Sequence, residues 1–212
     1  GKMRQSIDSC SRVGFTGGSV LSGLAALVTT ARTVIPDVEL DLREMVSRAQ
    51  VEALTDDGSL DIGLVRPPVT RPDLVSRPLI REPLVAALPK NHPLAGLDRP
   101  VDITDLHGVD LVMYSPIDSH YFFELLSSVF HEASVVPVVV QHLPQIHTIL
   151  SLVHFEWGVA VVPESASKMH FDNVVCRPLT LARPAHVDLD LVWRINNENP
   201  VLDRLLPALD LD

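Results

Sequence analysis

The sequence predicts an α/β protein made of two lobes. Apolar strand-like runs alternate with amphipathic helix-like segments over residues 11–66. The same alternation restarts near residue 110, after two strand-like runs and a loop rich in Pro, Asp and Gly. The chain also has 212 residues, more than a typical single domain. Alternation of this kind is typical of parallel sheets with helices packed on their faces.

The first lobe is predicted to run strand, helix, strand, helix, strand. Residues 11–16, 38–44 and 60–65 favour strands, and a helix should cover residues 48–55. The first helix should begin near Ser19 and end before Pro36. Its apolar side chains recur at helical spacing, at Leu21, Leu24, Val28 and Ala31.

The second lobe is predicted to follow two connecting strand-like runs, residues 74–80 and 83–88. Its expected strands cover residues 110–113, 135–140 and 158–162, with helices over residues 121–132 and 146–154. A strand-like run at 174–178, a strong strand at 187–194 and a helix at 200–209 complete the chain. The pattern alone leaves open which lobe receives the last strand and helix. Trp157 and Trp193 are expected in the core.

Charge and composition exclude several protein classes. The formal net charge is -10, and the 17 Lys and Arg residues are scattered, so the chain lacks the basic patch of a nucleic-acid surface. It shows no apolar run long enough to cross a bilayer and no signal-peptide core, which predicts a soluble protein. Two cysteines, Cys10 and Cys176, are too few for a disulfide framework and suit the cytoplasm.

Arg66 is the residue that points most directly to a ligand. It follows the apolar strand at residues 60–65 and precedes Pro67-Pro68. Open α/β sheets bind their ligands at the carboxyl ends of strands. Because a guanidinium matches carboxylate or phosphate, the sequence predicts a small anion here. The alternative is a salt bridge or a contact that orders the loop.

Two serines at predicted helix starts have two readings each. Ser19 follows two glycines, and Ser47 precedes the helix at residues 48–55. Either serine could be a helix N-cap, a very common role. The same geometry also attracts a carboxylate, because free N–H groups and the positive helix end lie there. The two readings are compatible.

Metal binding and catalysis are not expected. The nine histidines lack the spacing of a metal site, and His147 and His154 would lie about 10 Å apart on a helix. Ser115 and Ser119 lie close to His120, yet the chain has no nucleophile elbow, phosphate loop or dinucleotide fingerprint. The chain is therefore expected to be no enzyme and to need no cofactor.

Several runs together resemble the effector-binding domain of LysR-type transcriptional regulators. The resemblance covers residues 11–209, and within the family it is strongest to regulators of aromatic-compound catabolism. In sequence order the runs are Val13-Gly14-Phe15-Thr16-Gly17-Gly18-Ser19, Pro36-Asp37-Val38-Glu39-Leu40, Glu44-Met45-Val46-Ser47-Arg48-Ala49-Gln50, Asp57-Gly58-Ser59-Leu60-Asp61-Ile62-Gly63, Ala87-Leu88-Pro89, His92-Pro93-Leu94 and Gly158-Val159-Ala160-Val161-Val162-Pro163.

The resemblance implies two Rossmann-like subdomains with a hinge, as in type 2 periplasmic binding proteins. Subdomain I would comprise residues 1–82 plus 187–212, and subdomain II residues 83–186. A small acid, benzoate-like or muconate-like, would bind in the cleft between them. The resemblance also implies an N-terminal winged helix-turn-helix, absent from this chain, through which the whole protein would contact DNA.

The family's site maps onto strand ends and helix starts of both subdomains. The implied effector-binding residues are Gly18, Ser19, Val20, Ser47, Arg66, Tyr114, Ser115, His120, Phe122, Gln145 and Ile146. This sequence differs from the usual family pattern at two places that affect the assignment of these residues. The first turn carries an extra glycine, and His154-Phe155-Glu156-Trp157 replaces the small residues common before Gly158.

The resemblance further implies a homodimer or homotetramer. Two domains would pair side by side, with the first helix of one against a second-subdomain helix of its partner. Leu21, Leu24 and Val28 are candidates for this contact, unless all three face their own core. Two alternatives to a cytoplasmic regulator remain: a solute-binding protein of an uptake system, and a dehydratase or deaminase of the same fold.

Overall fold

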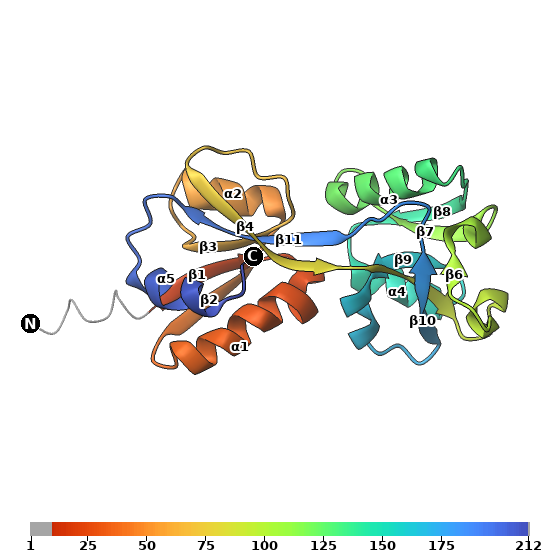
Figure 1. The fold of residues 1–212 in the computed structure, drawn as a ribbon, viewed down its shortest axis with the longest axis horizontal. Coiled ribbons are helices and arrows are strands. Elements are labelled where there is room, and N and C mark those ends of the chain that lie inside the picture. The colour runs from red at the N-terminus through yellow and green to blue at the C-terminus, as the bar shows by residue number, and fades with distance from the viewer. Residues whose placement is uncertain (1–9, 212) are drawn as a thin grey trace, which may run out of the picture. The chain divides into compact units, whose positions relative to one another are not determined.

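The structure, a computed structural model, describes residues 10–211 as two compact units (Figure 1). Unit 1 comprises Gly1–Arg81 and Asp188–Asp212, and unit 2 is the continuous segment Glu82–Val187. Both units combine sheets with helices, so the α/β prediction is confirmed. Each unit is described separately below.

Unit 1 is built on a five-stranded sheet of order β2-β1-β3-β11-β4. Its strands are β1 (Cys10–Phe15), β2 (Glu39–Glu44), β3 (Ile62–Val65), β4 (Leu74–Glu82) and β11 (Val187–Arg194). Strand β1 lies parallel to both β2 and β3, whereas β11 is antiparallel to β3. The sheet is therefore mixed, because the last strand returns in the opposite direction to the strands of the first lobe.

Helices cover both faces of this sheet. They are α1 (Ala25–Val34), α2 (Ser47–Thr55) and α5 (Pro200–Leu205). Side chains alternate along a strand, so Ile62 and Leu64 pack into a core with α1 and α5, while Val65 packs with α2. This two-sided burial explains why β3 reads as a continuous apolar run.

Unit 2 contains two sheets. The four-stranded sheet has the order β6-β10-β5-β9, and β5 is antiparallel to both β9 and β10. A parallel pair, β7 with β8, touches the segment before β9 through a bridge between Leu111 and Val159. The strands are β5 (Leu84–Pro89), β6 (Val101–Asp102), β7 (Asp110–Tyr114), β8 (Val138–Leu143), β9 (Ala160–Pro163) and β10 (Val174–Thr180).

Helices α3 (His120–Glu132) and α4 (Ile146–His154) bury one face each against these strands. A single apolar core results, which includes Leu126 of α3 and Ile149 and Leu150 of α4. The end of α4 is different. Glu156 has a φ of 65°, and the neighbouring Phe155 and Trp157 are 69% and 56% exposed. The prediction that Trp157 belongs to the core is therefore wrong; Trp193 does pack against the core of unit 1.

Candidate functional site

The carboxyl ends of three parallel strands come together at one edge of the unit 1 sheet. Strand β1 lies between β2 and β3, so the segments that follow all three strands are neighbours. Phe15 ends β1, the segment after β2 leads to Ser47, and Arg66 directly follows β3. Ligands bind at such an edge in open α/β sheets, because strand order reverses there and loops diverge.

Ser47 and Arg66 are in direct contact at this edge. The Ser47 Oγ accepts a hydrogen bond from the Arg66 backbone N–H at 3.1 Å. Helix α2 begins at Ser47 itself, and its N-cap position is Val46, which has no capping side chain. Ser47 is thus no N-cap: its hydroxyl links the start of α2 to the end of β3.

The Arg66 side chain is half-buried and anchored to strand β11. Its Nη1 donates to the Asp188 backbone carbonyl at 3.1 Å, and Arg81 pairs with the Asp188 carboxylate at 2.9 Å. The guanidinium is thereby held near the ends of the strands. This contact joins Arg66 to a strand, and the role of Arg66 toward a ligand stays a prediction.

The first strand–helix turn differs from the expected N-cap. Gly17–Ser19 form a 3-10 turn, Val20–Leu24 form a π-helical turn, and only then does α1 begin. Ser19 is fully buried, and its hydroxyl donates to the Thr16 carbonyl at 2.8 Å. Ser19 occupies the N-cap position of the π-helical turn, but its hydroxyl makes no capping hydrogen bond. Gly18 is half-buried beside it, whereas Val20 is 37% exposed.

Sequence reasoning missed two polar side chains close to this edge. The Thr16 hydroxyl and the Gln50 amide oxygen are buried, and neither has a hydrogen-bond partner among residues 10–211. Thr16 lies in the turn after β1, and Gln50 lies one turn into α2. A threonine directly between a buried strand and two glycines was the available signal for the first of them.

In unit 2, the predicted residues gather where β7 and β8 end. Tyr114 is the last residue of β7, and its ring stacks on Phe122 of α3 with 4.6 Å between centroids. Both rings are buried, so Phe122 packs in the core of its own unit. The Ser115 backbone N–H donates to Leu143, the last residue of β8.

The remaining unit 2 residues surround the turn that follows β7. The Ser115 Oγ accepts from the backbone N–H of Asp118 at 3.2 Å, and the Ser119 hydroxyl donates to the Pro144 carbonyl. His120, at the start of α3, is 70% exposed. At the start of α4, Gln145 is exposed, whereas Ile146 is buried in the core.

The candidate residues for pairing lie at the start of the first helix. Leu24 is 8% exposed and belongs to the core of unit 1, as the sequence left open. Val28 packs against the same core but keeps some exposed surface. Leu21 is half-buried. Leu21 and Val28 therefore remain the candidates for a contact with a partner.

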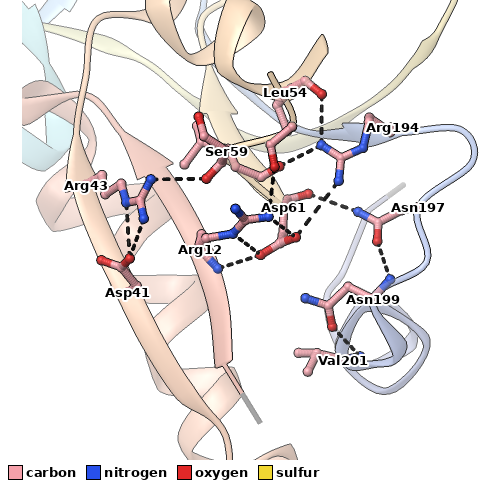
Figure 2. A network of polar contacts seen from close by, with 12 residues as sticks. Arg12, Asp41, Arg43, Leu54, Ser59, Asp61, Arg194, Asn197, Asn199 and Val201 are labelled. Carbon is pink, nitrogen blue, oxygen red and sulfur yellow. Dashed lines mark hydrogen bonds and ion pairs between the residues drawn. The ribbon is translucent and has the colours of Figure 1, made fainter. Parts of the chain in front are cut away.

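A separate polar network lies at the opposite ends of the strands (Figure 2). Asp61, just before β3, accepts from the Arg12 backbone at 2.8 Å and from the Arg12 Nε at 3.1 Å. Arg194 donates to the carbonyls of Leu54 and Leu60, and its Nη2 lies 3.9 Å from Asp61. The network joins β1, the start of β3 and the end of β11, so its role is to hold these strands together.

Residues 10–211 contain no group of three or more His, Cys, Asp or Glu side chains placed to hold a metal ion. None of the helices in these residues combines the length and the apolar character that crossing a bilayer requires.

Comparisons with known proteins and with a family model agree on one protein family. Residues 11–209 match the family described as LysR substrate binding domain. The chain is 28% identical, over 90% of its length, to the Hca operon transcriptional activator HcaR of Escherichia coli, and spans 63% of that protein. It is 30% identical, over 93% of its length, to the HTH-type transcriptional regulator CatR of Pseudomonas putida, and spans 66% of it. The chain thus spans slightly less than two thirds of the length of these relatives.

A solved structure matches over nearly the whole chain. The BenM effector binding domain with its effector benzoate superposes with a TM-score of 0.82 and is 25% identical. The match covers 94% of this chain and 89% of that one. BenM is an HTH-type transcriptional regulator of Acinetobacter baylyi.

Proposed function

This chain belongs to the LysR substrate-binding domain family, and we propose that it senses a small carboxylic acid, aromatic or dicarboxylic, for a cytoplasmic transcriptional regulator. It is the effector-binding domain of a LysR-type regulator, with the two-subdomain fold that resembles periplasmic binding proteins. It is not an enzyme, since its relatives are named transcriptional regulators.

The contact between Ser47 and Arg66 is the observation that supports a carboxylic acid as the ligand. It joins the Ser47 Oγ to the Arg66 backbone N–H at 3.1 Å, so the start of α2 and the residue that carries the guanidinium meet at one edge of the sheet. Carboxylates are stabilised by both groups, because each offers N–H donors and positive charge. Two related domains were solved with benzoate and with shikimate, and both molecules carry one carboxylate.

The proposed mechanism is a shift between two arrangements of the protein. An effector favours the arrangement that it contacts better, and only its difference in affinity for the two arrangements moves the equilibrium. In the whole protein this shift would reach DNA through an N-terminal helix-turn-helix. The binding cleft between the subdomains, and the unit 2 residues at the ends of β7 and β8, stay predictions of the same proposal.

The uptake-protein alternative is less favoured. The relatives are named as regulators of operons, not as transport components. Translation of the gene upstream of this segment distinguishes the two: a helix-turn-helix supports the regulator, and a signal sequence supports the uptake protein.

The first prediction concerns Arg66. Calorimetric titration with benzoate, shikimate and cis,cis-muconate should find binding by the wild type. Arg66→Ala should weaken that binding about tenfold or more, because a hydrogen bond to a charged group contributes about 1.5–3 kcal/mol. Arg32→Ala, an exposed arginine on α1, is the matched control and should bind as the wild type does.

Equal affinity of the wild type and Arg66→Ala would remove Arg66 from the site. If none of the three acids binds the wild type, the proposed ligand class itself is contradicted.

A further inference from the structure

Gln50 is an unusual residue for the inner face of a helix. It lies on α2 between the helix and the sheet, with no exposed surface, beside the apolar Ala53 and Leu54. Its Nε2 donates to the Met45 carbonyl at 3.0 Å. Its Oε1 has no hydrogen-bond partner among residues 10–211. A buried amide is costly unless it is fully hydrogen-bonded, so stability alone does not explain its presence.

Two glycines of the sheet make room for this amide. Gly14 of β1 and Gly63 of β3 are register partners in the parallel ladder. A Cβ at Gly14 would lie 2.9 Å from Gln50 Oε1, and a Cβ at Gly63 would lie 3.2 Å from the same atom. The Cα–H groups of both glycines therefore point toward the amide oxygen, an arrangement that forms weak hydrogen bonds. Helix α2 can approach the sheet closely only because both positions lack a side chain.

The same amide holds the segment that leads into α2. Met45 donates its N–H to the carbonyl of Phe15, the last residue of β1, at 2.8 Å. Its own carbonyl accepts from Gln50. The turn before α2 is thus fixed to β1 on one side and to the helix on the other. Ser47 follows two residues later and accepts from Arg66.

We propose that Gln50 is a positioning residue for the effector site: seated on the Gly14–Gly63 pair, it fixes the start of α2 so that the Ser47 hydroxyl meets Arg66. The inference rests on the proposed function, which it deepens. Gln50 itself does not touch the effector. It acts through Met45 and Ser47. An apolar side chain at this position could be equally buried, but it could not form the hydrogen bond that holds the turn before α2.

The test that needs no ligand is native-state hydrogen exchange on the 212-residue chain. Gln50→Met keeps length and burial but removes the amide. Exchange at the Met45 and Arg66 amides should become about tenfold faster, the effect of losing one hydrogen bond that restrains a local opening. Val201→Ala, in the core on the other face of the sheet, is the control for general destabilisation and should leave these two amides less affected.

Unchanged protection of both amides in Gln50→Met would overturn the proposal. So would equal acceleration in Gln50→Met and in a Val201→Ala variant of the same global stability, because that is what a merely structural role predicts.

Gly63→Ala provides a second variant in case Gln50→Met does not fold. Its Cβ presses on Gln50 Oε1 and on Leu54 Cδ1, at 3.2 and 3.1 Å, while every hydrogen-bonding group of Gln50 is retained. The same two amides should exchange faster. Wild-type exchange at Met45 and Arg66 in this variant overturns the proposal.

A binding arm uses benzoate as the probe. Affinity should fall about tenfold in Gln50→Met, as expected when one restraining hydrogen bond is lost, and stay unchanged in Val201→Ala. Equal affinity of Gln50→Met and wild type contradicts the positioning role. If none of benzoate, shikimate and cis,cis-muconate binds the wild type, the ligand class is contradicted, whereas the exchange result still decides for or against Gln50.

Discussion

Asp61 is a buried acidic side chain of unit 1 whose ionisation contributes to stability. It is 6% exposed. Burial opposes its ionisation, but hydrogen bonds from the Arg12 side chain and backbone outweigh burial, so the pKa of Asp61 lies below its ordinary value. A depressed pKa means that the folded protein favours the charged form of the Asp61 carboxylate. The contribution of Asp61 to the free energy of unfolding is therefore fully present above the unfolded-state pKa near 3.9, and it is lost as the pH falls through the folded-state pKa.

Asp61→Asn should lower the free energy of unfolding by about 2–4 kcal/mol at pH 7, because Arg12 and Arg194 lose their buried counter-charge. The difference should disappear as the pH falls through the depressed pKa of Asp61, where the wild type also loses the charge. Urea denaturation between pH 7 and pH 2 measures both effects.

Asp73→Asn is the control for this measurement, since the Asp73 side chain is 47% exposed and pairs with Arg71 at the surface. It should change stability little. A wild-type advantage over Asp61→Asn that stays constant down to pH 2 would contradict the ionic role of Asp61.

Single residues also show how far sequence reasoning reaches. Arg66 lies at the end of β3, where its neighbours in the chain predicted it, because a continuous apolar run marks the extent of a buried strand. The capping roles of Ser19 and Ser47 were wrong. In both cases the hydroxyl found a tertiary or turn partner, Thr16 or Arg66, that helix-start patterns do not contain. Gln50 could not be predicted, since its role depends on two glycines in different strands.

At the scale of elements, the first helix departs most from its pattern. Apolar spacing predicted one helix from Ser19, whereas a 3-10 turn and a π turn precede α1. Gly23 lies inside the π turn, where a Cβ would be only 2.1 Å from Leu189 Cδ2.

Gly23→Ala should therefore destabilise unit 1 by about 1–3 kcal/mol, the usual cost of overpacking a filled core. Leu189 has no exposed surface and cannot move aside toward solvent. Thermal or urea denaturation gives the measurement. Gly96→Ala, where no atom lies within 4 Å of the added Cβ, is the control. A Gly23→Ala variant as stable as wild type would mean that the π turn relaxes readily.

At the scale of the whole molecule, the fold class was predictable, but the direction of several strands was not. Alternation of strands and helices indicates parallel pairing, and β1 with β2 and β3 follow it. Strand β11 is separated from β3 by more than a hundred residues and enters antiparallel. A local pattern of apolar residues does not show in which direction a strand so distant in sequence pairs.

The whole molecule is also expected to associate with a second copy of itself. If two domains pair through the first helix, Leu21→Glu should shift the chain from dimer to monomer in sedimentation velocity at micromolar concentration. A charge placed in an apolar contact costs far more than one at an open surface. Ile195→Glu, which makes the same change at a side chain that is 61% exposed, should sediment as the wild type does. A monomeric wild type would count against pairing by this chain alone.

The division of unit 1 into two chain segments has a consequence for biosynthesis. The ribosome releases the segment that ends at Arg81 before unit 2, and it releases β11, which lies between β3 and β4 in the finished sheet, only after unit 2. At about 5–20 residues per second, the first segment waits several seconds or more for its missing strand. During that interval unit 2 can fold as a continuous segment, while β3 and β4 have no central partner and offer open edges to chaperones or to neighbouring nascent chains.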